Sequence, residues 1–296
     1  MQKPLLDHYL SFSTFTYPGL YQERLLRDLP TDISQAGRLV REQLIHKLSL
    51  HTGRMSPNVD DVVSKVPWYR QGEDDCFPTV AAMLAELYHR DPRGFVLDRA
   101  AEDKLILTCR TVATLMASIL KSRGIPARVR TGYAPYIRPD KLEEHWIVQY
   151  WHASSERWIA IDADTSLRDH PFDPFDLPTD AFYFAADAWF ALRTSRKSEN
   201  PSYLYSSAYH VLCDFHCLMN NEILYVHTPV FITPDFDHNA QQKLQEIDAL
   251  ASLMRQPDEN FVSLQEIWET NHDFRLLRGP GIGRMGARQY LAKNIG

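Results

Sequence analysis

The chain has 296 residues, 44% of them hydrophobic, and carries a formal net charge of −6. This length and hydrophobic content can bury a sizeable core, which argues against overall disorder and favours one large domain or a core with extensions. No block of lysine and arginine is long enough for a nucleic-acid track, and no apolar run has the length of a signal peptide or a membrane span. We therefore expect a cytoplasmic protein with neither nucleic-acid nor membrane partners. Four scattered cysteines are too few for a disulfide scaffold, which fits that compartment.

Two stretches in the first hundred residues have helical patterns. Apolar residues recur at helical spacing from Ile33 to Leu50 and again from Thr79 to His89. His46, near the end of the first pattern, has no cluster of metal-ligating partners around it in the sequence. We expect His46 to be a solvated or core-edge group.

The clearest helix signal begins at Cys109. Apolar side chains recur along residues 109–123 and define one face of an amphipathic helix, while Gly124 and Pro126 mark its end. Thr108 is the candidate N-cap. Cys109 then lies in the first turn, where backbone N–H groups and the helix dipole lower the pKa of a thiol. The segment therefore predicts a nucleophilic cysteine.

Two strand patterns follow, at residues 145–151 and 157–162, and a short polar stretch separates them. If the loop consists of the four residues 152–155, His145 stands directly opposite Asp162, with the two Cβ atoms about 5 Å apart. A five-residue loop would turn Asp162 to the other face of the sheet. The hairpin thus predicts a histidine–carboxylate pair that depends on loop length.

Together these motifs resemble the transglutaminase-like superfamily, the branch of papain-like thiol enzymes in which cysteine, histidine and aspartate follow in that order. The resemblance implies an α+β fold with a papain/transglutaminase-like core, in which the nucleophile helix packs on an antiparallel sheet, and with helical N- and C-terminal extensions. It is carried by four stretches, which are Thr108–Thr111, Leu120–Tyr133, Glu144–Trp151 and Trp158–Asp162.

The resemblance also implies roles for three residues. It maps the nucleophile onto Cys109, the general base onto His145 and the orienting carboxylate onto Asp162. No metal or other cofactor is expected.

Three further residues are candidates for the oxyanion or substrate site. Thiol enzymes need a second hydrogen-bond donor for the oxyanion, and Trp68 or Gln71 could supply it from upstream, although aromatic packing is the alternative for Trp68. Arg110 is a further candidate because a neighbouring cation favours the thiolate.

The region after the hairpin is expected to be helical. A proline-dense connection at 169–178 can continue neither strand nor helix. We predict a mostly helical N-terminal part of the core at 1–100, the catalytic core at 101–168, and a helical extension packed on the core at 169–296. The helical patterns of that extension are at 179–193, 203–221, 239–255 and 263–270.

The predicted function is attack on an amide or ester carbonyl through a Cys109 acyl-enzyme. The substrate would be an amide- or ester-bearing peptide or small molecule. The second step would be either hydrolysis, as in a protease or amidase, or transfer to an amine acceptor, as in transglutaminase-like amide formation. The alternative is a non-catalytic binding module that keeps the transglutaminase-like fold, which predicts an ordinary Cys109 pKa and an occluded site.

Overall fold

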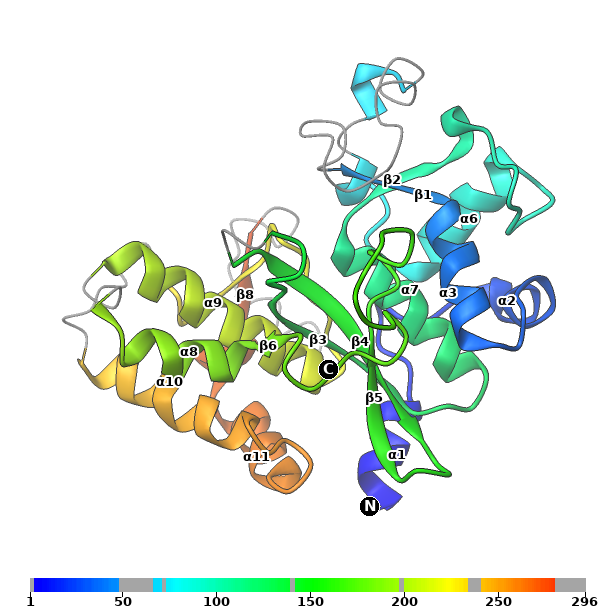
Figure 1. The fold of residues 1–296 in the computed structure, drawn as a ribbon. Helices are drawn as coiled ribbons and strands as arrows, with labels where there is room; N and C mark the ends of the chain where they lie inside the picture. Colours follow the sequence, from blue (N-terminus) through cyan, green and yellow to red (C-terminus); the bar gives the residue numbers. More distant parts are fainter. Residues whose placement is uncertain are drawn as a thin grey trace, which may run out of the picture. The chain divides into compact units, whose positions relative to one another are not determined.

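The computed structural model of the chain describes residues 3–47, 66–70, 73–138, 142–196, 200–233 and 241–279 (Figure 1). The chain is α+β and divides into two compact units, the first comprising Met1–Arg130 with Ala134–Phe182 and the second Thr131–Tyr133 with Tyr183–Gly296. Residues 169–182 lie in the first unit. Within the described ranges, no helix combines the length and apolarity needed to cross a bilayer.

The first unit begins with short helices whose starts are set by local caps. Asp32 accepts a hydrogen bond from the backbone N–H of Gln35 at 2.8 Å, at the start of α3 (Ile33–Glu42). Thr79 caps α6 (Val80–Arg90) in the same way, which confirms the helix predicted there. The remaining elements of this part are α1 (Lys3–Leu10), η1 (Gly19–Tyr21), α2 (Gln22–Asp28), η2 (Trp68–Arg70), η3 (Glu73–Asp75) and η4 (Ala101–Asp103).

The helix predicted from Ile33 to Leu50 was wrong beyond Glu42. The chain instead forms a strand, β1 (Leu44–His46), which pairs in parallel with β2 (Leu105–Leu107) and places His46 in register with Leu107. All three residues of β1 are buried. A partner strand about sixty residues away outweighs the local helical periodicity, and the pairing brings His46 beside the segment that leads into Cys109.

Helix α7 (Cys109–Ser122) begins and ends where the sequence predicted. Thr108 is its N-cap residue, and the Thr111 hydroxyl accepts a hydrogen bond from the Thr108 N–H at 2.9 Å. At the other end Gly124 has a φ of +73°, and the N–H of Ile125 bonds to the carbonyl of Leu120 at 3.0 Å, as in a Schellman motif. Most of α7 is buried and it packs on β4 (Glu144–His152), so Cys109 is fixed at the start of the central helix.

The hairpin of β4 and β5 (Arg157–Ile161) is confirmed, but its register differs from the prediction by two residues. His152 pairs with Arg157, so the four loop residues are 153–156, and Glu156 takes a left-handed φ of 50°. Because side chains alternate with a period of two, an even shift leaves every side chain on its predicted face. β4 lies between β5 and β3 (Ala127–Tyr133) in the sheet.

The second unit is mostly helical. The helix predicted at 179–193 was wrong over its first residues, because Tyr183–Phe184 form β6, which pairs antiparallel with the last residues of β3 before α8 (Ala185–Arg193) begins. The helices predicted further on are confirmed as α9, α10 and α11. The bounds here are α9 (Pro201–Leu218), β7 (Thr228–Pro229), α10 (Gln241–Met254), α11 (Phe261–Thr270), α12 (His272–Arg275) and β8 (Leu277–Arg278).

We predict that Gly124→Ala lowers the free energy of unfolding by about 1–2 kcal/mol, because an alanine in the left-handed region is strained. A Cβ at this position would meet nothing within 4 Å, so the cost arises from the backbone and not from a clash. Gly124→Asn is the control, since asparagine tolerates this conformation better and should lose less. Urea denaturation measures both variants, and equal stability of the alanine variant and the wild type would contradict the prediction.

Candidate active site

Three buried side chains meet at the termini of three elements of the first unit. Cys109 opens α7, His145 is the second residue of β4, and Asp162 directly follows β5. The exposed fractions are 6%, 2% and 1% respectively. His145 Nε2 lies 2.9 Å from Asp162 Oδ2, which leaves the other ring nitrogen for the hydrogen bond between His145 and Cys109. The structure thus brings the predicted cysteine, histidine and aspartate together, with His145 hydrogen-bonded to both of the others.

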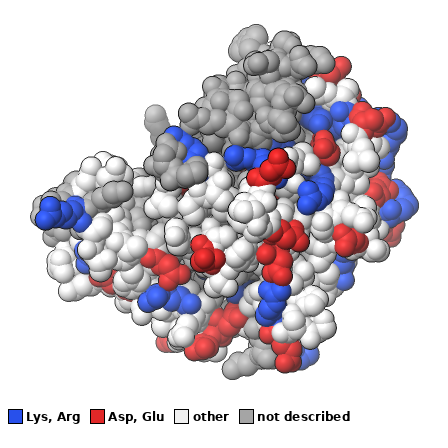
Figure 2. Space-filling view, in the orientation of Figure 1, with Lys and Arg blue, Asp and Glu red and all other residues white. Residues whose placement is uncertain are grey.

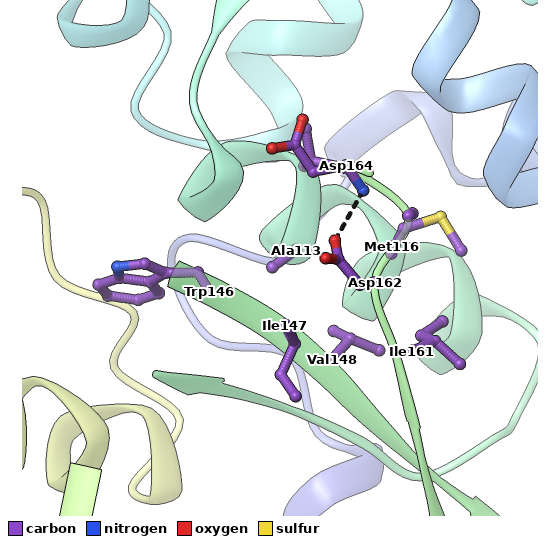
Figure 3. A pocket seen from close by; sticks show the side chains of 10 residues that line it. Ala113, Met116, Trp146, Ile147, Val148, Ile161, Asp162 and Asp164 are labelled. Atoms are coloured by element: carbon purple, nitrogen blue, oxygen red, sulfur yellow. Dashed lines mark hydrogen bonds between the residues drawn. The ribbon is translucent and has the colours of Figure 1, made fainter. Parts of the chain in front are cut away.

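Asp162 is held by a set of hydrogen bonds from its own loop and from Tyr136. The hydroxyls of Tyr136 and Thr165 each donate to Oδ2 at 2.8 Å. The backbone N–H of Asp164 donates to Oδ1 at 3.1 Å, which is the dashed line in Figure 3. Burial raises the pKa of the Asp162 carboxyl, but the positive charge of His145 and these hydrogen bonds lower it more, to about 2. Asp162 is therefore a fixed anion that orients the imidazole.

The carboxylates of Asp162 and Asp164 border a small pocket between α7 and the β4–β5 hairpin (Figure 3). The two side chains point in different directions. The rest of the pocket is lined by apolar groups, which keep the local dielectric low and strengthen charge interactions there. These are Val112, Ala113, Met116, Trp146, Ile147, Val148, Ile161 and Ala163.

The thiol and the imidazole stabilise each other in their charged forms. Burial raises the pKa of the Cys109 thiol, but the charge of His145 and hydrogen bonds from His145 and His46 lower it more, from 9.0 to about 6. Burial likewise opposes the charging of His145, yet Asp162 and the Cys109 thiolate raise its pKa well above 6.5. At neutral pH the pair is a thiolate and an imidazolium, which is the reactive form of a thiol nucleophile.

A second histidine, His46, also reaches Cys109. The expectation that it is a solvated or core-edge group was wrong, because it is only 4% exposed and hydrogen-bonds the Cys109 side chain. Its Nε2 lies 3.5 Å from Asp164 Oδ2. The long-range pairing of β1 with β2 creates this contact, and no local motif in the sequence signals it.

Sequence reasoning also missed Tyr136 and Thr165. Tyr136 lies in the connection between β3 and β4, and its ring meets those of His145 and His170 edge to face, with centroid distances of 6.5 and 5.6 Å. Burial and the charge of Asp162 raise the Tyr136 pKa well above 10.0, so the phenol stays protonated and remains a donor. Thr165 had a detectable signal, since a threonine three residues after an aspartate suits a turn in which both carboxylate oxygens accept local hydrogen bonds.

The three remaining candidates for the oxyanion or substrate site are Arg110, Trp68 and Gln71. The Arg110 guanidinium lies 5.0 Å from the centroid of the Phe15 ring, and its Nη1 donates to the carbonyl of Pro78 at 3.4 Å. Trp68 begins η2, but its side chain and the whole of Gln71 lie outside the described residues, so both assignments stay predictions. In the part of the chain that the structure describes, no three His, Cys, Asp or Glu side chains are grouped to hold a metal ion.

Comparison with known proteins agrees with this geometry. Residues 90–163 match the family described as the Transglutaminase-like superfamily, and the match includes Cys109, His145 and Asp162. This segment is therefore similar to transglutaminase-like domains, as its motifs predicted, and the similarity supports a cysteine thiol enzyme at the general level.

The chain also matches a solved structure, a provisionally assigned cysteine protease from Cytophaga hutchinsonii. The identity is 16% over 64% of this chain and 50% of that chain, with a TM-score of 0.34. The chain thus spans half the length of that protein. The comparison with curated proteins finds no match.

We predict that iodoacetamide alkylates Cys109 with a rate that is half-maximal near pH 6, because the lowered thiol pKa keeps the thiolate above that pH and protonates it below. In His145→Ala the profile should move towards 9.0, since the imidazolium that stabilises the thiolate is gone. His152→Ala, at the far end of the same strand, is the matched control and should keep the wild-type profile.

Mass spectrometry locates the label, and Cys109→Ser measures the contribution of Cys76, which is exposed. A wild-type profile centred near the ordinary thiol value of 9.0, or one that His145→Ala leaves unchanged, would contradict the assignment of the ion pair.

Proposed function

We propose that this chain is a thiol enzyme that acts on an amide or ester carbonyl through an acyl-enzyme on Cys109. The observation that carries the proposal is the buried, hydrogen-bonded set of Cys109, His145 and Asp162. Cys109 lies at the start of a helix, and the pKa of its thiol falls to about 6. A cysteine at a helix start or a buried histidine by itself is compatible with simple packing. The combination of nucleophile, base and orienting carboxylate supports covalent catalysis.

The proposed chemistry divides into two halves. In the first, the Cys109 thiolate attacks the carbonyl carbon, and the carbonyl π electrons move to the oxygen. As the tetrahedral intermediate collapses, the C–N or C–O bond breaks and the His145 imidazolium gives its proton to the leaving amine or alcohol. A thioester on Cys109 and a neutral imidazole remain, while Asp162 stays ionised throughout because its pKa is about 2.

The second half transfers the acyl group to an acceptor. Neutral His145 takes a proton from the incoming water or amine while that acceptor attacks the thioester carbon. The C–S bond then breaks, which releases the Cys109 thiolate. The product is a carboxylic acid when the acceptor is water and an amide when it is an amine. The two reactions share every protein group named so far. The acceptor is therefore decided by access to the thioester, and a partition experiment measures it directly.

The proposed substrate is an amide- or ester-bearing peptide or small molecule. Acidic and basic side chains are interspersed over the described part of the face in Figure 2, and the net charge of −6 gives no overall attraction to polyanions. These properties support a substrate recognised at the acyl group and not through an extended anionic backbone.

One observation favours the alternative, a non-catalytic binding module that keeps the fold. Cys109 is only 6% exposed, and burial of the thiol is what an occluded site would show. The lowered pKa of Cys109 opposes this alternative, because a cysteine retained only for packing gains nothing from two histidine partners. Reaction of Cys109 with an acyl donor separates the two functions.

We predict that p-nitrophenyl acetate acetylates Cys109 and releases a burst of one p-nitrophenolate per chain, because the thiolate attacks an activated ester without further activation. Cys109→Ser should show no burst, and mass spectrometry should place the acetyl group on Cys109. A binding module would leave Cys109 unacetylated.

The acetyl-enzyme can then be incubated with and without a primary amine such as butylamine. Release of acetate at a rate independent of the amine indicates a hydrolase. Formation of N-butylacetamide in proportion to the amine concentration indicates an acyltransferase.

A further inference from the structure

His46 approaches Cys109 from the side of the helix N-terminus. The parallel register of β1 and β2 sets His46 level with Leu107, and only Thr108 separates Leu107 from Cys109. The first N–H groups of an α-helix have no acceptor within the helix and favour negative charge near them. His46 therefore adds a side-chain donor at the same end of α7 at which the backbone donors of the first turn lie.

A buried carboxylate and a buried guanidinium support His46. Asp164 and Arg41 are 1% and 2% exposed, and Arg41 Nε lies 3.2 Å from Asp164 Oδ1. The same Nε donates to the backbone carbonyl of Asp164 at 2.6 Å, and Nη1 donates to the carbonyl of Leu44 at 2.8 Å. Arg41 thereby ties Asp164 to the strand that carries His46.

The second oxygen of Asp164 faces His46 Nε2 at 3.5 Å. Among the described residues, neither carboxylate oxygen of Asp164 accepts a conventional hydrogen bond. A buried carboxylate is costly unless cations or donors surround it, so the nearby Arg41 guanidinium stabilises Asp164 in its place beside the His46 ring. Asp164 thus lies against the His46 ring at a longer distance than the 2.9 Å that separates Asp162 from the His145 ring.

We infer that His46 is a catalytic residue that supplies a side-chain N–H to the oxyanion formed when Cys109 attacks its substrate, with Asp164 and Arg41 holding the imidazole in position. The inference rests on the proposed function. In the free enzyme the His46 N–H is hydrogen-bonded to the Cys109 side chain. When sulfur shares its electron pair with the carbonyl carbon, the negative charge moves to the oxygen two bonds away, and the same donor then finds its acceptor there.

This role differs from that of His145. The His145 ring must give up a proton and take one back, which requires that it engage the leaving group and the acceptor. His46 needs only to donate a hydrogen bond, so its proton is conserved through the reaction. The difference gives the experiment its readout, because alkylation of the thiolate develops no oxyanion, whereas acylation does.

The test compares His46→Leu, which removes the donor, with His46→Gln, which keeps a side-chain N–H. For each variant the plateau rate above the thiol pKa is measured for alkylation by iodoacetamide and for acetylation by p-nitrophenyl acetate. We predict that His46→Leu lowers the acetylation plateau by about 10²-fold or more and leaves the alkylation plateau unchanged. His46→Gln should recover part of the acetylation rate.

Asp164→Asn provides a second measurement that does not alter the donor itself. It should lower the acetylation plateau by less than His46→Leu and leave alkylation unchanged, because it loosens the imidazole without removing it. Thermal unfolding of each variant verifies that it is folded. Equal loss of both rates, or no loss of acetylation in His46→Leu and Asp164→Asn, would overturn the role of His46.

The same data separate this inference from the proposed function. If p-nitrophenyl acetate acetylates wild-type Cys109 as fast as it acetylates the His46 variants, the thiol enzyme stands and the oxyanion role of His46 is overturned. If the wild type itself is not acetylated, the proposed function fails and the role of His46 fails with it.

Discussion

The structure of the site depends on a buried ion pair between the Cys109 thiolate and the His145 imidazolium. Burial of either charge alone would be expensive, and for both groups burial is the largest influence that disfavours the charged form. The charges persist because each stabilises the other and because Asp162, itself held at a pKa of about 2, places a third fixed charge behind the imidazole. Loss of His145 would leave the charges of Cys109 and Asp162 without the cation between them, in a site of low dielectric.

The rest of the first unit supplies the positions that this ion pair requires. The capped start of α7 fixes the thiol, the second residue of β4 carries the imidazole, and Asp162 directly follows the last residue of β5. The Asp162 N–H donates to the carbonyl of Pro174 at 2.7 Å, which anchors the loop after β5. The site thus joins a local unit, the β4–β5 hairpin, to the helix that carries the thiol.

The sequence predicted the parts of the site that local physics controls. The capping residue, the apolar face and the glycine that ends α7 are all encoded within residues 108–124, so both helix ends were correct. The hairpin register was wrong by two residues, since loop composition does not define where a turn begins. His145 and Asp162 kept their common face because the error was even.

The positions of His46 and Tyr136 could not be predicted from the sequence, because they depend on contacts between distant parts of the chain. β1 is three residues long and has no strand pattern of its own, so only its pairing with β2 converts a helical periodicity into a strand and moves His46 to the site. Tyr136 comes from an irregular connection and reaches Asp162 across 26 residues of chain. Such contacts arise from tertiary packing, which no spacing rule in one sequence encodes.

The most direct test of the account is the charge state of the His145 ring, measured by NMR on histidine labelled in its ring nitrogens. We predict that both ring nitrogens of His145 carry protons at neutral pH in the wild type, and that the pKa of His145 falls in Cys109→Ala because the thiolate no longer stabilises the imidazolium. A His145 ring that is neutral at neutral pH in the wild type, or a pKa that Cys109→Ala leaves unchanged, would contradict the ion pair and the chemistry built on it.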